Sequence, residues 1–185
     1  MSAMISQTLQ GAVLSATSNV LAQAIAAYKN DTTFSLDPSP ILKFALFSII
    51  SSPPNILWQS FLEDILPTNV RVAPSEKKKN ATQRSTLNIF LKFLLDQTFG
   101  ALFNNLMFLA FMGYTLHLSS GSSASAYEAV LAYIKTNLVP MAIDGYKFWP
   151  AVSLASFLWV PVDKRVVFGC AAGMIWGIYL GLLYG

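Results

Sequence analysis

The sequence predicts an all-α integral membrane protein, folded as a bundle of four to five transmembrane helices with one short interfacial helix. The 185 residues are 54% hydrophobic and only 11% charged, whereas an ordinary soluble domain carries about 25% charged residues. The mean hydropathy is correspondingly high, at +0.51. Residues 9–27 and 166–184 contain no Asp, Glu, Lys or Arg, and each stretch is long enough to cross the hydrocarbon core as a helix. We therefore expect one membrane domain over residues 1–185, with the lipid bilayer as its solvent and partner.

The first two predicted helices cover residues 6–28 and 40–62. The first is apolar, is rich in small residues, and ends where charged and turn-forming residues begin. The second contains Pro53 and Pro54. Each proline removes a backbone donor, and the second disfavours the helical conformation of the first. We expect a kink or a short break at residues 53–54.

The middle of the chain alternates polar and apolar segments. Residues 63–86 hold two prolines and a cluster of charges, which predicts a polar loop. Residues 87–117 form a long apolar stretch and predict the third transmembrane helix. Residues 124–139 are amphipathic and precede Pro140, so we expect a short interfacial helix there.

Two further helices are predicted at residues 143–161 and 165–184. Asp144 and Lys147 shorten the apolar part of the former, so its crossing decides between four and five spans. If all five helices cross, one side of the membrane collects most cationic residues, namely Arg71, Lys77, Lys78, Lys79, Arg84, Lys164 and Arg165. The positive-inside rule predicts that this side faces the cytosol or the matrix.

Glycine recurs at every fourth position of the last helix, at Gly169, Gly173, Gly177 and Gly181. Side chains four positions apart share one helix face, so these glycines form a groove into which another backbone can pack closely. The first helix carries a matching ridge of small residues, which are Gly11, Ser15, Ser18, Ala22 and Ala26. We expect the glycine face to pack either on this ridge or on a second copy, as a homo-oligomer.

The third helix carries a polar face. Asp96, Gln97 and Asn104 fall within about 100° of one another on a regular helix, and polar groups in lipid are costly unless they meet water or partners. Two interpretations remain open: the residues line a polar path for small solutes, or they hydrogen-bond other helices. The candidate polar partners are Asn19, Gln23, Lys147 and Arg165.

Several classes of function are disfavoured by the composition. The net charge is only +3 and the basic residues are local, so we expect no nucleic-acid partner. Cys170 is the single cysteine and His117 the single histidine, which leaves no disulfide and no usual zinc ligand set. We expect no cofactor, no metal site and no enzymatic activity, because a catalytic site needs several convergent reactive groups.

The sequence nevertheless resembles one known family, and the likeness covers nearly the whole chain. Its C-terminal signature comprises Trp149, Pro150, Phe157 to Pro161, Arg165 and Trp176. Upstream, the matching motifs are Leu21 to Gln23, Pro54 to Trp58, and Asp96 with Gln97. Together they resemble the Mpv17/PMP22 family of peroxisomal and mitochondrial membrane proteins. The chain departs from the usual family residues at Asn19, Pro53 and Ser156.

The resemblance implies a multi-helix organelle membrane protein, usually described with four spans. It also implies channel-like permeability to small solutes and roles in metabolite exchange and organelle maintenance. We therefore expect a weakly selective channel or pore for small metabolites. The alternative is a structural or tethering protein without transport. The peroxisomal membrane is the favoured location, and the mitochondrial inner membrane is the alternative.

Overall fold

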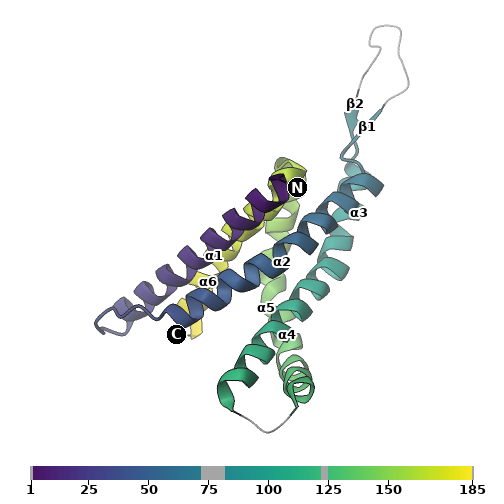
Figure 1. Cartoon of the computed structure of the whole chain (residues 1–185). Helices are drawn as coiled ribbons and strands as arrows, with labels where there is room; N and C mark the ends of the chain where they lie inside the picture. Colours follow the sequence, from purple (N-terminus) through teal and green to yellow (C-terminus); the bar gives the residue numbers. More distant parts are fainter. Residues whose placement is uncertain (1, 72–81, 122–124, 185) are drawn as a thin grey trace, which may run out of the picture.

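A computed structural model of the chain describes residues 2–71, 82–121 and 125–184, and helices dominate all three parts (Figure 1). The α-helices are α1 (Ser2–Lys29), α2 (Pro38–Ile65), α3 (Thr86–Leu95), α4 (Ala101–Ser120), α5 (Ala126–Trp159) and α6 (Arg165–Tyr184). A π-helical turn, η1 (Asp96–Gly100), joins α3 to α4, and a 3-10 turn, η2 (Val162–Lys164), precedes α6. The predicted all-α class is confirmed.

The helices form two groups. α1 packs chiefly on α2 and α6, while α4 packs chiefly on α5. α3, η1 and α4 form one continuous rod, Thr86–Ser120, hereafter the α3–α4 rod. The groups touch where α2 meets this rod and where α5 meets α6, and Figure 1 shows α4 and α5 leading away from α2 toward their own connecting turn. The contact between α2 and the rod is thus one of the two places that join the groups.

Within the described residues, the cationic segments that the sequence analysis placed on one side of the membrane lie together at one end of the bundle. Arg165 at the start of α6 pairs with Glu63 near the end of α2, and Arg84 before α3 bonds the carbonyl of Leu158 near the end of α5. The first turns of α1 and residues 160–168 line a common groove at this end. The N-terminus lies there and the C-terminus lies toward the other end (Figure 1).

Residues 63–86, predicted as a polar loop, carry more structure than expected. They begin with the last turn of α2, and a two-stranded antiparallel ladder of β1 (Asn69–Arg71) and β2 (Thr82–Arg84) follows. The Ser85 amide donates to the Thr68 carbonyl at 2.9 Å and closes the base of this hairpin. Composition alone did not indicate the pairing. The predicted lysine cluster at 77–79 lies outside the described residues.

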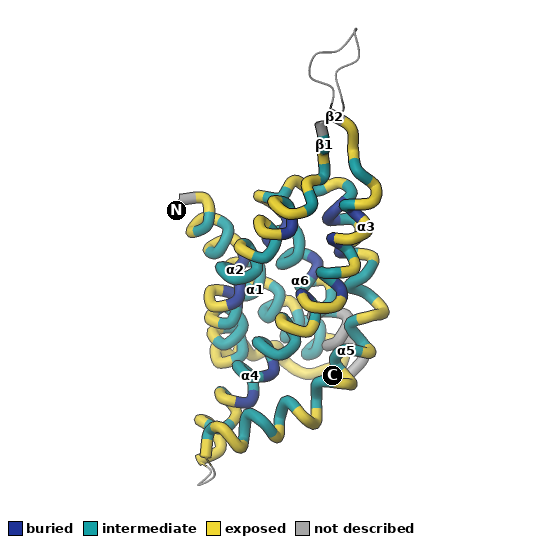
Figure 2. Tube along the Cα trace, turned by 90° about the vertical axis from the view of Figure 1, so that its right-hand side faces the viewer, coloured by how far each residue is buried: buried dark blue, intermediate teal, exposed yellow. Residues whose placement is uncertain are grey.

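The outer surfaces of α2 and the α3–α4 rod are apolar. Within the described residues, these two helices are long and apolar enough to cross a membrane, and only 17% of the most apolar window of each is buried. Leu57 is 60% exposed and Phe99 is 66% exposed, and Figure 2 shows that buried segments are sparse. A core helix of a soluble protein would be mostly covered, so these side chains are suited to lipid contact.

Of the two alternatives expected at residues 53–54, a kink or a short break, the break is absent. α2 is continuous from Pro38 to Ile65 with Pro53 and Pro54 inside it. Polar side chains add hydrogen bonds in the adjoining turns: Ser52 donates to the Ser48 carbonyl at 2.6 Å, and Asn55 donates to the Ser51 carbonyl at 2.9 Å. A membrane helix tolerates proline where such local bonds and neighbouring helices support the backbone.

The predicted interfacial helix at 124–139 and the predicted helix at 143–161 are one helix. α5 runs unbroken from Ala126 to Trp159 with Pro140 and Pro150 inside it, so the expected stop before Pro140 is wrong. The first half of α5 packs closely on α4, since a Cβ added at Gly113 of α4 would lie 3.0 Å from the Cβ of Tyr133 in α5. At 1.5 Å per residue, α5 is about 50 Å long and exceeds the hydrocarbon core.

Candidate functional site: a polar seam between two helical rods

Polar residues line both sides of the contact between α2 and the α3–α4 rod. On α2 they recur at every fourth position, and on the rod they occupy the positions that face them in antiparallel order. We call this set the polar seam; it comprises Asn55, Gln59 and Glu63 on α2 and Lys92, Asp96 and Asn104 on the rod. The pairs are Glu63 with Lys92, Gln59 with Asp96, and Asn55 with Asn104.

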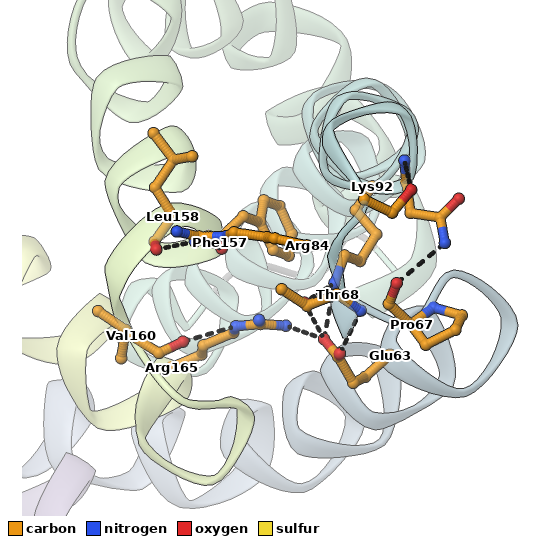
Figure 3. A network of polar contacts seen from close by, with 11 residues as sticks. Glu63, Pro67, Thr68, Arg84, Lys92, Phe157, Leu158, Val160 and Arg165 are labelled. Carbon is orange, nitrogen blue, oxygen red and sulfur yellow. Dashed lines mark hydrogen bonds and ion pairs between the residues drawn. The ribbon is translucent and has the colours of Figure 1, made fainter. Parts of the chain in front are cut away.

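A charged cluster closes the seam at the hairpin end (Figure 3). Glu63 Oε2 lies 2.6 Å from Lys92 Nζ and 3.0 Å from Arg165 Nη1. The Thr68 amide donates to Glu63 Oε1 at 2.7 Å, and Lys92 also donates to the Thr68 hydroxyl at 2.6 Å. The Lys92 side chain is 0% exposed and that of Arg165 is 4% exposed. Burying cations is costly unless they are paired, so Glu63 is what permits both to be buried.

The same cluster attaches the end of α5. The Phe157 ring lies 5.6 Å from Lys92 Nζ and 4.9 Å from the Arg165 guanidinium carbon, both within cation–π range. Arg84 donates to the carbonyls of Phe157 and Leu158, and Arg165 Nε donates to the Val160 carbonyl at 3.2 Å. Cations suit a helix C-terminus, where backbone carbonyls are unsatisfied. The hairpin, α3, α5 and α6 are thereby joined around one ring.

Asp96 occupies the middle of the seam. Its Oδ1 accepts hydrogen bonds from Trp58 Nε1 and Gln59 Nε2, each at 3.1 Å, and its Oδ2 accepts from the Ser153 hydroxyl at 2.6 Å. A Cβ at Gly100 would lie 2.9 Å from Trp58 Nε1, so glycine provides the space for the indole. Asp96 therefore bonds α2 and α5. The partners suggested from sequence, Asn19, Gln23, Lys147 and Arg165, are not those that hold it.

The two asparagines form a reciprocal amide pair. Asn55 Nδ2 donates to Asn104 Oδ1 at 2.8 Å, and Asn104 Nδ2 donates to Asn55 Oδ1 at 2.9 Å. Each also donates to a carbonyl of its own helix, at Ser51 and Gly100 respectively. Hydrogen bonds between side-chain amides help to hold membrane helices together, because no hydrophobic force acts between helices in lipid. Asn104 thus faces α2, as an inward polar face requires.

Gln97 lies in the π-turn and is 8% exposed. Its backbone carbonyl accepts a hydrogen bond from the Tyr146 hydroxyl of α5 at 2.8 Å. In a regular α-helix the Ala101 amide would occupy that carbonyl, but here it donates to the carbonyls of Asp96 and Thr98. Tyr146 therefore bonds an oxygen that the π-turn releases.

Asn19 and Gln23 lie away from the seam. Gln23 Nε2 donates to Asn19 Oδ1 and to the Asp37 carbonyl, both at 2.8 Å, and the Asp37 amide donates back to Gln23 Oε1 at 2.8 Å. Asp37 in turn caps α2 through the Ser39 amide. These two residues fasten the turn between α1 and α2 and do not meet Asp96.

The glycine face of α6 is open where it is described. A Cβ added at Gly169 would meet nothing within 4 Å, and one at Gly173 would meet only the Trp149 ring at 3.8 Å. Close packing on α1 occurs instead at Gly11, where a Cβ would lie 3.0 Å from the Ser48 hydroxyl and 3.1 Å from the Cys170 sulfur. The side chains around Gly177 and Gly181 lie outside the described residues.

The remaining motif residues lie where α5 meets α6. Trp176 and Phe148 stack with ring centroids 5.2 Å apart, and Phe148 meets Trp149 edge-on at 5.4 Å. Pro150 continues α5, and Pro161 is the residue that precedes the turn into α6. Arg165 belongs to the charged cluster described above.

Sequence reasoning did not place six residues in the site, namely Asn55, Gln59, Glu63, Lys92, Tyr146 and Ser153. A signal for Lys92 was available, because 92, 96, 100 and 104 follow one another at four-residue intervals in an apolar stretch. No signal marked Tyr146, whose role depends on a π-turn. Among the described residues, no group of three or more His, Cys, Asp or Glu side chains is placed to hold a metal.

Comparison with known proteins points to one family of membrane proteins. A family profile described as the Mpv17 / PMP22 family matches residues 121–181, which include α5 and most of α6. An uncharacterised protein of Schizosaccharomyces pombe is 26% identical, and the alignment covers 94% of this chain and 79% of that protein. PXMP2/4 family protein 3 of Dictyostelium discoideum is 29% identical over 96% of this chain and 82% of that protein. Mitochondrial inner membrane protein Mpv17 of Drosophila melanogaster is 23% identical over 80% of this chain and 76% of that protein. No solved structure matches the chain.

The C-terminal motif, from Trp149 to Trp176, lies within the residues that the family profile matches, and the relatives align with most of the chain. The fold of this chain is helical, and its two most apolar helices expose apolar side chains on the outside of the bundle, as a bilayer requires. The chain is similar to the Mpv17/PMP22 family of membrane proteins, over residues 121–181 by the family profile and over most of its length by these relatives.

Proposed function

We propose that the protein is a weakly selective channel or pore for small metabolites in an organelle membrane, with the polar seam as its path. The observation that carries this proposal is the position of the seam. It runs between two helices whose other faces expose large apolar side chains. Ionisable and amide groups inside a membrane bundle commonly mark solute or ion pathways.

The chemistry of the seam suits uncharged or weakly charged solutes. Asn55, Gln59 and Asn104 offer amide donors and acceptors, and Asp96 is the one carboxylate in the middle of the seam. These groups bond one another, so a solute or water molecule could pass only by replacing those bonds as α2 and the rod separate. Amide groups discriminate poorly between small polar solutes, which predicts weak selectivity.

Solute flux into liposomes tests the proposal directly. Purified protein in vesicles is expected to pass small polar solutes, and replacing both Asn55 and Asn104 with Leu is expected to abolish the flux. Gln10→Leu is the matched control, since Gln10 is an exposed residue of α1 outside the seam. If vesicles with a control porin pass the solutes and vesicles with this protein do not, the proposal is wrong.

A channel of this kind requires the helices to cross the membrane. We propose five crossings, by α1, α2, the α3–α4 rod, α5 and α6, with the hairpin end toward the cytosol or the matrix. In a Cys170→Ser background, Gln83→Cys and Phe34→Cys should be labelled by an impermeant maleimide from opposite sides of sealed membranes. Labelling of both from the same side would contradict an odd number of crossings between them.

The organelle is a separate part of the proposal. The resemblance favours the peroxisomal membrane, with the mitochondrial inner membrane as the alternative. One relative supports an organelle location, since it is named a mitochondrial inner membrane protein. Imaging of the tagged protein with markers for both organelles decides between the two. Plasma-membrane staining alone would refute both locations.

A structural or tethering role without transport is the second candidate. The open face at Gly169 and Gly173 favours it, because a glycine groove that the chain itself leaves unfilled can accept a second copy. Replacing both glycines with Leu should disperse oligomers on a native gel. Oligomers that migrate unchanged would count against this role.

A further inference from the structure

The register of the polar seam depends on the π-turn. Asn104 follows Lys92 by twelve positions, and on a regular α-helix at about 100° per residue the two would point about 120° apart. A π-turn closes its hydrogen bond over one extra residue, which acts as an insertion and reduces the angle to about 20°. Lys92 and Asn104 both contact α2, at Glu63 and Asn55. The turn η1 therefore places both ends of the rod's polar stripe against the same helix.

The π-turn is held from outside the rod. An i-to-i+5 bond forms where the Ala101 amide donates to the Asp96 carbonyl, and the amide's second contact goes to Thr98. The Gln97 carbonyl between them receives the Tyr146 hydroxyl at 2.8 Å. In a regular helix Ala101 would compete for that carbonyl. Because the Tyr146 hydroxyl already bonds the Gln97 carbonyl, it opposes the return of the Ala101 amide to that carbonyl and so opposes conversion of the π-turn to an α-turn.

We propose that Tyr146 is a positioning residue, whose hydroxyl holds the π-turn at Asp96–Gly100 and so sets the register in which α2 meets the α3–α4 rod. Without the hydroxyl, the Ala101 amide can return to the Gln97 carbonyl. α4 then turns by about 100° relative to α3, which carries Asn104 away from Asn55. The inference concerns helix register and holds whether or not the seam conducts solutes, so its test does not use flux.

Cross-linking reports the register. Phe47 of α2 and Phe108 of α4 meet edge-on with centroids 5.2 Å apart, so cysteines at these two positions in a Cys170→Ser background should be joined by a short bifunctional thiol reagent. Loss of one hydrogen bond shifts the equilibrium between the two registers by about fivefold, and Tyr146→Phe is expected to lower the cross-link yield by up to that factor. Tyr127→Phe is the matched control, because Tyr127 is an exposed residue of the same helix.

A second cysteine pair separates rotation from unfolding. Ser18 of α1 and Met174 of α6 are in contact in the other helix group, and their cross-link should not change in Tyr146→Phe. If the α2–α4 yield stays at the wild-type value in Tyr146→Phe, the proposal is overturned. It is equally overturned if both cross-links fall together, since that result shows general destabilisation.

Deletion of one residue gives the most specific test. Thr98 is exposed, and its hydroxyl donates to carbonyls of its own helix at Leu94 and Leu95. Removing Thr98 should convert the π-turn into an α-turn with the same register, so the Phe47–Phe108 cross-link is retained and Tyr146→Phe no longer lowers it. Removing Ser60 from α2, which has no π-turn to absorb the loss, should abolish the cross-link. Equal loss in both deletions would refute the proposal.

Discussion

The Ser153 hydroxyl of α5 donates to Asp96 Oδ2 at 2.6 Å, while Trp58 and Gln59 of α2 donate to Asp96 Oδ1. One carboxylate thus receives donors from two helices that belong to different packing groups. Charge-assisted hydrogen bonds are about twice as strong as neutral ones. Asp96 is for this reason one of the groups that hold α2, α5 and the α3–α4 rod together.

Replacing Asp96 with Ala should destabilise the fold by about 2–4 kcal/mol, since the donors of Trp58, Gln59 and Ser153 then lose their acceptor inside the bundle. Reversible unfolding in mixed micelles, followed by circular dichroism, measures the change. Asp163→Ala is the control, because Asp163 is exposed, and should change the stability by less than about 0.5 kcal/mol. Equal effects of the two substitutions would show that the carboxylate does not join the helices.

Glu63→Gln should be among the most destabilising single substitutions, by about 3–5 kcal/mol, because it leaves the buried cations of Lys92 and Arg165 without a counter-charge. The neighbouring Asp64→Asn removes the same charge from an exposed side chain and should change little. Unfolding in mixed micelles again gives the comparison.

A compensating substitution checks the cause of that loss. Lys92→Met removes one buried cation, and in the Glu63→Gln background it should restore part of the lost stability, because an apolar replacement of a buried pair is commonly tolerated. If Lys92→Met makes the Glu63→Gln protein still less stable, charge burial is not the reason for the effect of Glu63→Gln.

Gly100→Ala should cost about 1–3 kcal/mol, as overpacking in a filled interior does. The added Cβ would lie 2.9 Å from Trp58 Nε1 and 3.1 Å from Asp96 Oδ1, so the indole must move and its bond to Asp96 weakens. Gly169→Ala is the control, since nothing lies within 4 Å of its Cβ and Ala has the higher helix propensity. Thermal unfolding of the detergent-solubilised proteins should rank Gly169→Ala at or above wild type.

Much of the fold followed from the sequence because its cause is local composition. The charge-free stretches and the sparse charge required lipid-facing helices, and the described structure is all-α with most predicted helices in place. The breaks at Pro53 and Pro140 did not follow. A proline removes one hydrogen bond, and packing against α4 or bonds from Ser52 and Asn55 keep the helix continuous. Local rules cannot weigh that tertiary support.

The sequence predicted the direction in which the polar face of the third helix points, but not the residues that it bonds. The polar face of the third helix had to point inward, and Asp96 and Asn104 both do so. Which helix meets that face depends on how the two groups pack, and Asn19 and Gln23 proved to bond the α1–α2 turn. Nothing in the residues of 96–100 indicates a π-turn, because that turn depends on a hydroxyl 49 positions from Gln97 in the chain, at Tyr146.

The amide pair of Asn55 and Asn104 should show a measurable coupling energy. Their two mutual hydrogen bonds, at 2.8 and 2.9 Å, are lost together when either residue becomes Ala. A double-mutant cycle of Asn55→Ala and Asn104→Ala should therefore give a coupling of about 0.6–1.7 kcal/mol, the range found for polar bonds between membrane helices.

Asn137→Ala provides the comparison for this cycle, because Asn137 donates only to the Tyr133 carbonyl of its own helix among the bonds described. Combined with Asn55→Ala it should be additive within about 0.5 kcal/mol. A coupling between Asn55 and Asn104 no larger than this additive control would mean that the amides bond water or lipid headgroups in the bilayer. The seam would then be already open at the end formed by Asn55 and Asn104. The hydrogen-bonded group of Asp96, Gln59 and Trp58 would be the barrier that a solute meets.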